Sequence, residues 1–281
     1  MKRKRFLNCI LIVLLLMGVT LIPSKLVKAS PTSVNLTPNK KYTAYDVTGD
    51  KKKDTVYIKT TEGKYGVCKS VAVSVNGKIA YKFTNKNFWE LKAKLYTLDN
   101  GQPFLYLYAV FDNGGGPVCG LFQYQSGKLK QVINFQTLMK SYGIHQSGEI
   151  VKMNGNNVKA RFYVMSYSLG PAYIDYNYVY QDGTLKPTSK TGSYYRVYTG
   201  GKTNSAFITN KTIQAYRAAG SSQKAFTLKK GNKVTIDKCW VNGKQMYIRV
   251  KYNGKSGWIK ASAKTPVNNK DKQFSNVTYA G

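Results

Sequence analysis

The sequence predicts an all-β protein built from two domains, and three observations carry this expectation. Short runs rich in Val, Ile, Tyr, Phe and Thr recur along the chain, and these residue types favour strands. Turn dipeptides of the Asn-Gly and Asp-Gly type separate many of the runs, and both tolerate the positive φ that tight hairpin turns require. Helical periodicity is weak throughout, so only residues 88–94 and 134–141 are predicted as short helices.

The first thirty residues have the pattern of a signal peptide. A basic start at residues 2–5 precedes an apolar run over 6–22, and Val27 and Ala29 have the spacing of a cleavage site, so residues 1–29 form the leader. The apolar run is shorter than the ~20 residues that a spanning helix requires, which favours cleavage over an uncleaved anchor. No second apolar run follows. The mature chain is therefore expected to be secreted and associated with the cell envelope, with no transmembrane helix after cleavage.

The whole chain is strongly basic, with 44 Lys and Arg residues against 12 Asp and Glu residues. Six of the basic residues lie in the leader, which leaves the mature chain with a net charge of +26. Such a field attracts polyanions and is screened by salt over ~8–10 Å. Only four arginines remain after the leader, so diffuse attraction is expected rather than a shaped phosphate pocket or a specific nucleic-acid site. The alternative is that the lysines reflect composition and solubility alone.

The supply of catalytic and metal-binding side chains is small. The mature chain has three cysteines, so at least one thiol is unpaired; Cys68 and Cys119 could form a disulfide or be buried apolar residues. The single histidine, His145, cannot build a zinc site of two or three histidines, and no cysteine lies in a recognisable nucleophile segment. We therefore expect a non-catalytic protein. A wall hydrolase of unrecognised arrangement is the alternative.

Composition divides the mature chain into segments. Five glycines that follow turn residues, at positions 77, 101, 127, 155 and 183, lie 24 to 28 residues apart and predict a meander of successive hairpins. A small, polar stretch over 199–206 separates the two domains. The predicted segments are a linker over 30–40, a β-rich domain over 41–198, a small domain over 205–263 and a loose tail over 264–281.

An aspartate-rich loop precedes the strand predicted at 55–58. Its candidate metal ligands are Asp46, Thr48, Asp50 and Asp54. Oxygen ligands at alternating loop positions, with one more four residues later, can surround a hard cation. The loop resembles the calcium loops of integrin-like (FG-GAP-like) and VCBS-type β-propeller repeats, which implies a propeller-like first domain and Ca²⁺ binding. It departs from that pattern at Thr48, where Asn or Asp is usual, and at Lys51, where Gly is usual. The alternative is a turn held without calcium by Asx hydrogen bonds.

Tyrosines crowd the segment 163–180. Alternation along a strand places Tyr176, Tyr178 and Tyr180 on one face. Such a row can stack on sugars or bases, although the packing of one sheet face already explains it.

The C-terminal domain carries a second resemblance. Residues 226–236 read as a strand, a turn at Gly231 and another strand, and 247–260 read as a hairpin that ends in Gly257-Trp258-Ile259. This order resembles bacterial SH3 (SH3b) domains over about 55 residues. Tyr247 stands where the family commonly has Trp. The resemblance implies a small SH3-like barrel that binds peptidoglycan peptides.

The candidate ligand-binding residues are the aromatic side chains of this domain. Tyr216, Trp240, Tyr247 and Tyr252 are expected to form an exposed groove, and Trp258 is expected either to close the barrel or to contact the ligand. The sequence thus predicts a secreted, non-catalytic envelope protein that binds peptidoglycan or another anionic wall polymer. An accessory or inhibitory protein that binds a protein or glycan partner is the alternative, and that partner is unknown.

Overall fold

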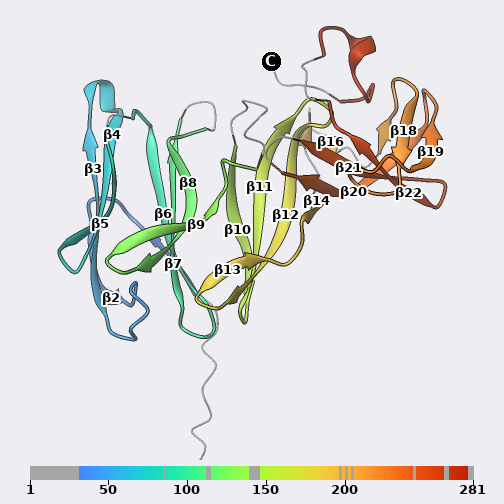
Figure 1. The fold of residues 1–281 in the computed structure, drawn as a ribbon. Helices are drawn as coiled ribbons and strands as arrows, with labels where there is room; N and C mark the ends of the chain where they lie inside the picture. The colour runs from blue at the N-terminus through green and yellow to red at the C-terminus, as the bar shows by residue number, and fades with distance from the viewer. Residues whose placement is uncertain are drawn as a thin grey trace, which may run out of the picture.

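The computed structural model of the chain is all-β (Figure 1), which confirms the predicted fold class. It describes residues 32–84, 86–111, 115–138, 146–195, 198–199, 202–203, 206–242, 245–262 and 266–277. Within these ranges the strands form antiparallel sheets without an α-helix. No helix there is long and apolar enough to cross a membrane. The predicted leader and His145 lie outside the described residues.

Two sheets form the N-terminal half. The first has the strand order β2-β3-β4-β5 and the second has the order β1-β6-β7-β8-β9. The bounds in the first sheet are β2 (Lys41–Tyr45), β3 (Asp54–Glu62), β4 (Cys68–Val75) and β5 (Lys78–Phe83), with a 3-10 turn η1 (Lys64–Gly66) between β3 and β4. The bounds in the second are β1 (Thr32–Leu36), β6 (Glu90–Thr97), β7 (Pro103–Val110), β8 (Val118–Gln125) and β9 (Lys128–Asn134).

The third sheet contains eleven strands in the order β10-β11-β12-β14-β20-β21-β22-β18-β19, with β13 paired to β12 and β17 paired to β20. The bounds of its N-terminal strands are β10 (Ser147–Asn154), β11 (Asn157–Ser166), β12 (Gly170–Gln181), β13 (Thr184–Pro187) and β14 (Thr191–Tyr195). Those of its C-terminal strands are β17 (Phe207–Ile208), β18 (Ile213–Tyr216), β19 (Lys224–Leu228), β20 (Lys233–Val241), β21 (Met246–Tyr252) and β22 (Lys255–Lys260). A separate two-stranded pair, β15 (Tyr198–Thr199) and β16 (Lys202–Thr203), comes between these two sets of strands in the sequence.

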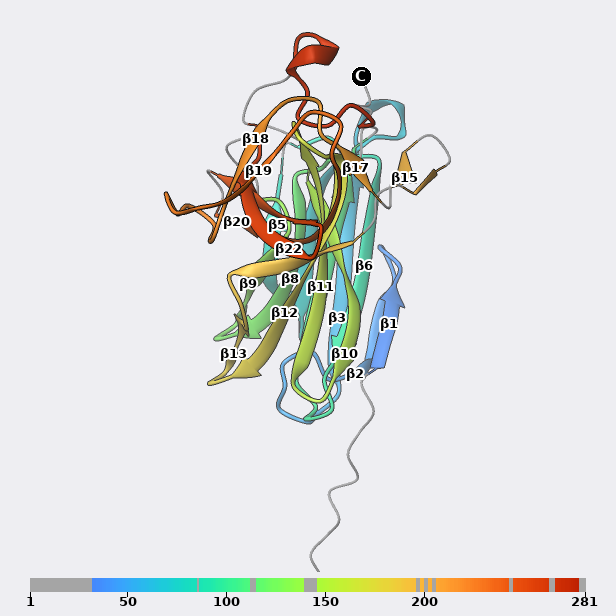
Figure 2. The same ribbon diagram turned by 90° about the vertical axis from the view of Figure 1, so that its right-hand side faces the viewer.

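The sheets stack as layers, with an apolar core on each side of the second sheet (Figure 1). One core joins the first and second sheets around residues such as Ile58, Val73 and Leu107. The other joins the second and third sheets around Phe135 and Phe162, whose ring centroids lie 5.0 Å apart. Figure 2 shows that strands of all three layers run along the long axis, whereas β18–β22 curve across one end.

The predicted hairpins are confirmed. Each of the five regularly spaced glycines lies in a tight turn with positive φ, between β4 and β5, β6 and β7, β8 and β9, β10 and β11, and β12 and β13. The prediction succeeded because positive φ is a local requirement that glycine meets at little steric cost.

The two predicted short helices do not form in the described residues. Phe88 makes a bridge with Cys68, and β6 occupies 90–97 with Leu91, Ala93 and Leu95 buried in alternation. A helix would turn some of these side chains away from the core, so burial of the alternating set overrides the helix propensity of the intervening lysines. Residues 135–138 form turns, and 139–141 lie outside the described residues.

The third sheet continues across the stretch where the sequence places a domain boundary. Strand β14 pairs with β20, so that Thr191 lies opposite Trp240 and Ser193 lies opposite Lys238. One apolar core likewise includes residues from both sides of the stretch. In the described part of the chain the sheets close into neither a barrel nor a propeller.

The C-terminal segment differs from the predicted loose tail. Phe274 and Val277 are buried, and the ring of Phe274 lies 5.2 Å from that of Phe207. Thr209 forms a bridge with Phe274, and the 3-10 turn η3 (Asn269–Asp271) precedes it. Two isolated apolar residues in a polar segment give no periodic signal, yet their burial is enough to hold the segment against the sheet.

Candidate functional site

The aspartate loop turns its carboxylates toward its own backbone. Asp54 is 3% exposed, and its carboxylate accepts hydrogen bonds from the backbone N–H groups of Val47 and Thr48 at 2.8 Å and from the amide of Asn76 at 2.6 Å. Burial raises the pKa of Asp54, but these hydrogen bonds outweigh it, so the pKa lies below its usual value. The carboxylate of Asp54 is therefore ionised at neutral pH and stabilises the turn through these hydrogen bonds.

The other acids of the loop make similar contacts. Asp46 accepts hydrogen bonds from the N–H groups of Gly49 at 2.6 Å and Lys51 at 2.8 Å, and Asp50 accepts one from Lys52 at 2.8 Å. Lys51 adopts the positive φ of 68° at the position where the calcium loops have Gly. Across the described residues, no group of three or more His, Cys, Asp and Glu side chains could hold a metal ion. The geometry therefore favours the alternative, a turn held without calcium by Asx hydrogen bonds, over the calcium site that the resemblance implies.

Four of the five predicted aromatic residues share one face of the C-terminal sheet. Tyr216 lies opposite Trp258 across β18 and β22, and Trp240 lies opposite Tyr247 across β20 and β21. Tyr247 in turn lies opposite Lys260, which is two residues from Trp258, so both pairs lie on the same side of the sheet.

The fifth aromatic residue, Tyr252, lies on the opposite face. It packs against the core, with its ring 6.4 Å from that of Phe226. Because Tyr252 is an odd number of residues from Tyr247 along the same strand, alternation sends the two side chains to opposite faces. The predicted set is therefore brought together without Tyr252.

The aromatic side chains of this face differ in exposure. Trp258 is 9% exposed and serves mainly as packing, whereas Tyr216, Trp240 and Tyr247 are half-buried. The rings of Trp240 and Tyr247 meet at 5.6 Å with an interplanar angle of 64°. This pair offers an aromatic edge and a ring face to a ligand.

A cationic network surrounds the aromatic pairs. Arg249 donates to Asp237 from Nε at 2.8 Å and from Nη2 at 2.5 Å, and Nζ of Lys251 lies 3.0 Å from the same carboxylate. Burial raises the pKa of Asp237, but the bonds from Arg249 and Lys251 lower it by more, so that Asp237 stays ionised. Lys238 pairs with Arg249 in register. We call this surface the aromatic–basic face; it comprises Tyr216, Lys238, Trp240, Tyr247, Arg249, Lys251, Trp258 and Lys260.

The sequence-based selection missed the charged members of this face. Arg249 and Lys251 alternate with Ile248 and Val250 in a strand that was expected, so alternation places them beside Tyr247. Asp237 is one of only two acidic residues in 204–281, and this scarcity in a basic segment could have marked it as a partner of the nearby cations.

Two hollows border the aromatic–basic face at opposite ends of its strands. One of 390 Å³ lies beside Trp240 and is lined by Tyr176 and Tyr178. The other, of 630 Å³, lies beside the β21–β22 turn and is lined by Lys233, Lys251 and Tyr252. Tyr252 therefore reaches the rim of a concavity although its ring packs inward.

The three cysteines among the described residues are free thiols, and Cys68 and Cys119 do not form a disulfide. Cys119 and Cys239 are buried, and burial raises the pKa of Cys119 to about 11 and also raises that of Cys239. Cys68 is half-buried. These thiols are protonated at neutral pH, which does not suit a nucleophile.

No protein-family model, curated protein or solved structure matches the chain significantly. The geometry of the described residues is therefore the basis for assigning a function.

Proposed function

We propose that this protein is exported, stays at the bacterial cell envelope, and binds peptidoglycan or another anionic wall polymer without transforming it. The aromatic–basic face carries the proposal. It places four cations and the Trp240–Tyr247 pair on one side of the sheet, where the carboxylate of Asp237 binds two of the cations. Such a surface supplies both long-range attraction for a polyanion and aromatic contact area at short range.

The ionic contacts on this face leave a net positive charge. Asp237 neutralises one of the two cations that it contacts, Arg249 and Lys251, while the pairing of Arg249 holds its guanidinium in a fixed orientation. Lys238 and Lys260 lie on the same side of the sheet and have no acidic partner among the described residues. These two lysines are the cations with the freedom to contact a polymer phosphate or carboxylate.

We propose the two finer fold assignments as well. Residues 207–260 have the spatial order β17-β20-β21-β22-β18-β19 and a tight turn at Gly231, which supports an SH3-like barrel that is open in the described residues. Three successive antiparallel meanders, β2–β5, β6–β9 and β10–β13, support a propeller-like relationship for the first domain.

The experiment is a sedimentation assay with purified peptidoglycan sacculi and the complete mature chain. Residues 205–263 alone would lose strand β14 and the buried Phe274, so a fragment is unsuitable. We expect the wild-type chain to sediment with sacculi at low salt and to be released as salt screens the contact.

A matched pair of variants locates the binding surface. Lys238→Gln with Lys260→Gln removes two charges from the aromatic–basic face, and Lys59→Gln with Lys130→Gln removes two exposed charges from the first and second sheets. A lysine near an anionic surface contributes ~1 kcal/mol, so the first pair should weaken binding roughly tenfold or more. The proposal would be contradicted if the wild-type protein stayed in the supernatant at low salt. It would also be contradicted if both pairs of substitutions weakened binding equally.

A further inference from the structure

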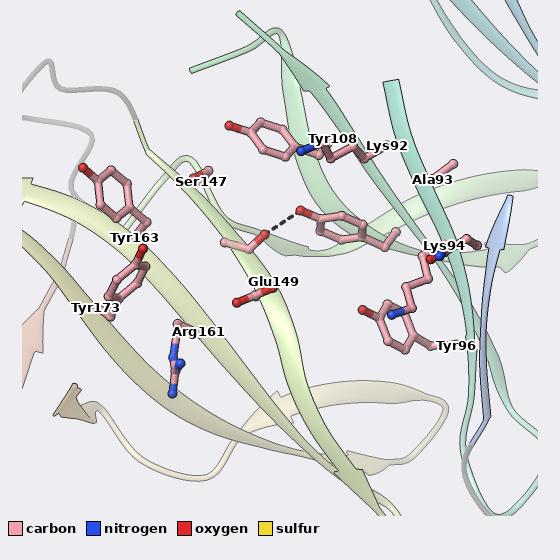
Figure 3. Close-up of a pocket in the computed structure, with 13 residues that line it drawn as sticks. Lys92, Ala93, Lys94, Tyr96, Tyr108, Ser147, Glu149, Arg161, Tyr163 and Tyr173 are labelled. Atoms are coloured by element: carbon pink, nitrogen blue, oxygen red, sulfur yellow. Dashed lines mark hydrogen bonds between the residues drawn. The ribbon is translucent and has the colours of Figure 1, made fainter. Parts of the chain in front are cut away.

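A cleft of 610 Å³ is lined by residues of the second and third sheets beside the edge strand β10, and it includes no residue of the aromatic–basic face (Figure 3). Strands β6 and β7 supply one wall, with Lys94, Tyr96 and Tyr108. Strands β11 and β12 supply the other, with Tyr163 and Tyr173. In Figure 3 Glu149, on the edge strand β10, lies between the two walls. We call this site the tyrosine cleft.

One wall of the tyrosine cleft belongs to a row of aromatic rings across three adjacent strands. Tyr163 lies opposite Tyr173, and Tyr173 lies opposite Tyr195, with ring centroids 5.3 Å and 6.5 Å apart. All three side chains lie on the sheet face opposite the buried Phe162 and Ile174. The row ends at the exposed Tyr195 ring, which lies outside the cleft lining and stacks against Arg161.

A hydrogen bond joins the two sheets at the floor of the cleft beside β10. The Tyr106 hydroxyl donates a hydrogen bond of 2.6 Å to the backbone carbonyl of Gly148, shown dashed in Figure 3. Burial raises the pKa of Tyr106, and it raises that of Tyr96 to about 12, so both phenols are neutral at physiological pH. The lining thus presents aromatic faces and neutral hydroxyl groups.

The charges of the cleft are balanced. Arg161 is bound by Asp175, with N–O distances of 2.7 and 2.9 Å, and Lys92 lies 3.7 Å from Glu90. This leaves one cation, Lys94, and one anion, Glu149, among the charged lining residues. A cleft with no net charge is unusual on a mature chain of net charge +26.

We propose that the tyrosine cleft binds a neutral oligosaccharide. The C–H faces of a sugar ring are apolar and carry slight positive charge, so they complement the electron-rich faces of tyrosine rings. Sugar hydroxyls can donate to the Glu149 carboxylate and accept from Lys94, and bonds to charged groups are the stronger ones. A polyanion lacks this match, because Glu149 repels it and Asp175 and Glu90 already occupy two of the cations.

The chain is tested first on an array of neutral and acidic oligosaccharides, at about 0.05 M and about 0.5 M salt. We expect neutral glycans to bind at both salt concentrations, because no net charge is screened. Since this site shares no residue with the aromatic–basic face, its outcome is separate from that of the sacculus assay. An array without neutral glycans among the bound probes, or with binding that disappears at the higher salt, would overturn the inference.

Variants then place the binding in the cleft, by calorimetric titration with the strongest neutral oligosaccharide of the array. Tyr173→Ala should weaken binding about tenfold or more, and Tyr173→Phe should retain most of it, because the ring face is kept. Glu149→Gln changes an exposed side chain that the fold does not need, and it should also weaken binding. Tyr247→Ala, on the aromatic–basic face, is the control that should bind normally. Normal binding by both Tyr173→Ala and Glu149→Gln, or loss in Tyr247→Ala, would contradict the assignment.

Discussion

The guanidinium of Arg161 lies 3.7 Å from the centre of the Tyr195 ring while it holds the carboxylate of Asp175 with two hydrogen bonds. Asp175 and Arg161 lie opposite each other on β12 and β11, and Tyr195 comes from the neighbouring strand β14. The arginine therefore ties three strands together beneath the tyrosine cleft. The hydrogen bonds that Arg161 donates to Asp175 raise the pKa of the guanidinium further, so Arg161 keeps its positive charge.

Replacing Arg161 tests how much this pair contributes. Arg161→Ala leaves the Asp175 charge buried without its partner, which should lower the free energy of unfolding by about 3–5 kcal/mol. Tyr195→Ala, which removes the cation–π contact and the ring contact with Tyr173 but leaves the ion pair, should cost about 1–2 kcal/mol. Urea unfolding of both variants measures the difference, and equal losses would show that the ion pair is not the main contribution.

The aspartate loop should be indifferent to calcium. A cation present at 100 times its dissociation constant would stabilise the fold by ~2.7 kcal/mol, whereas the Asp46 and Asp54 carboxylates already accept backbone hydrogen bonds. Melting curves in calcium and in chelator should therefore coincide. A higher melting temperature in calcium, absent in Asp50→Ala, would show that the loop rearranges around the ion.

Acid should destabilise the protein through Asp54 and Asp237. Both have folded-state pKa values below that of an unfolded Asp, which is ~3.9. Their contribution is complete above that unfolded value and is lost as the pH falls through the lower folded-state value. Urea midpoints from about pH 7 to about pH 2 should fall in the acid range. The fall should be shallower in Asp54→Asn, and an equal slope would show that other carboxyls dominate.

The thiols should differ in reactivity. Burial raises the pKa of all three thiols, but Cys68 is only half-buried, whereas Cys119 and Cys239 are buried. A thiol reagent should therefore label Cys68 in the native mature protein and the other two only after unfolding. Mass spectrometry of the labelled peptides identifies each site. Fewer than three labelled thiols in denaturant without reductant would indicate a disulfide.

Gly257 should not tolerate a side chain. A Cβ there would lie 2.9 Å from the Cβ of Ala215 and 2.9 Å from the ring of Phe226. Gly257→Ala should therefore cost about 1–3 kcal/mol through overpacking. Thermal unfolding measures the loss, and adding Ala215→Gly should recover part of it. An unchanged melting temperature would mean that β18 and β22 can move apart.

Local chemistry made much of the fold predictable. Gly77, Gly101 and Gly183 mark hairpin turns because the need for positive φ is decided within two residues. Gly257 is a glycine for a different reason. The structure places it inside β22, where the close approach of Ala215 requires a residue without a side chain.

Long-range pairing could not be derived in the same way. The contact of β14 with β20 joins residues more than forty positions apart, and no local signal fixes which sheet edge a short strand meets. The aromatic–basic face could be predicted in part, because alternation along a strand places Tyr247, Arg249 and Lys251 on the same side of the sheet. The tyrosine cleft could not be predicted in this way, because Glu149 and Lys94 come to line one cleft only after two sheets have packed.

The pairing of β14 with β20 also determines how two occupied surfaces would cooperate. If a flexible linker joined two binding surfaces, the probability that the second surface binds after the first would depend on the length and entropy of the linker. In this protein the two surfaces belong to one continuous hydrogen-bonded sheet, which fixes the distance between them and their relative orientation. A partner that presents both ligands at the matching span gains avidity, and one that presents them at another span gains none.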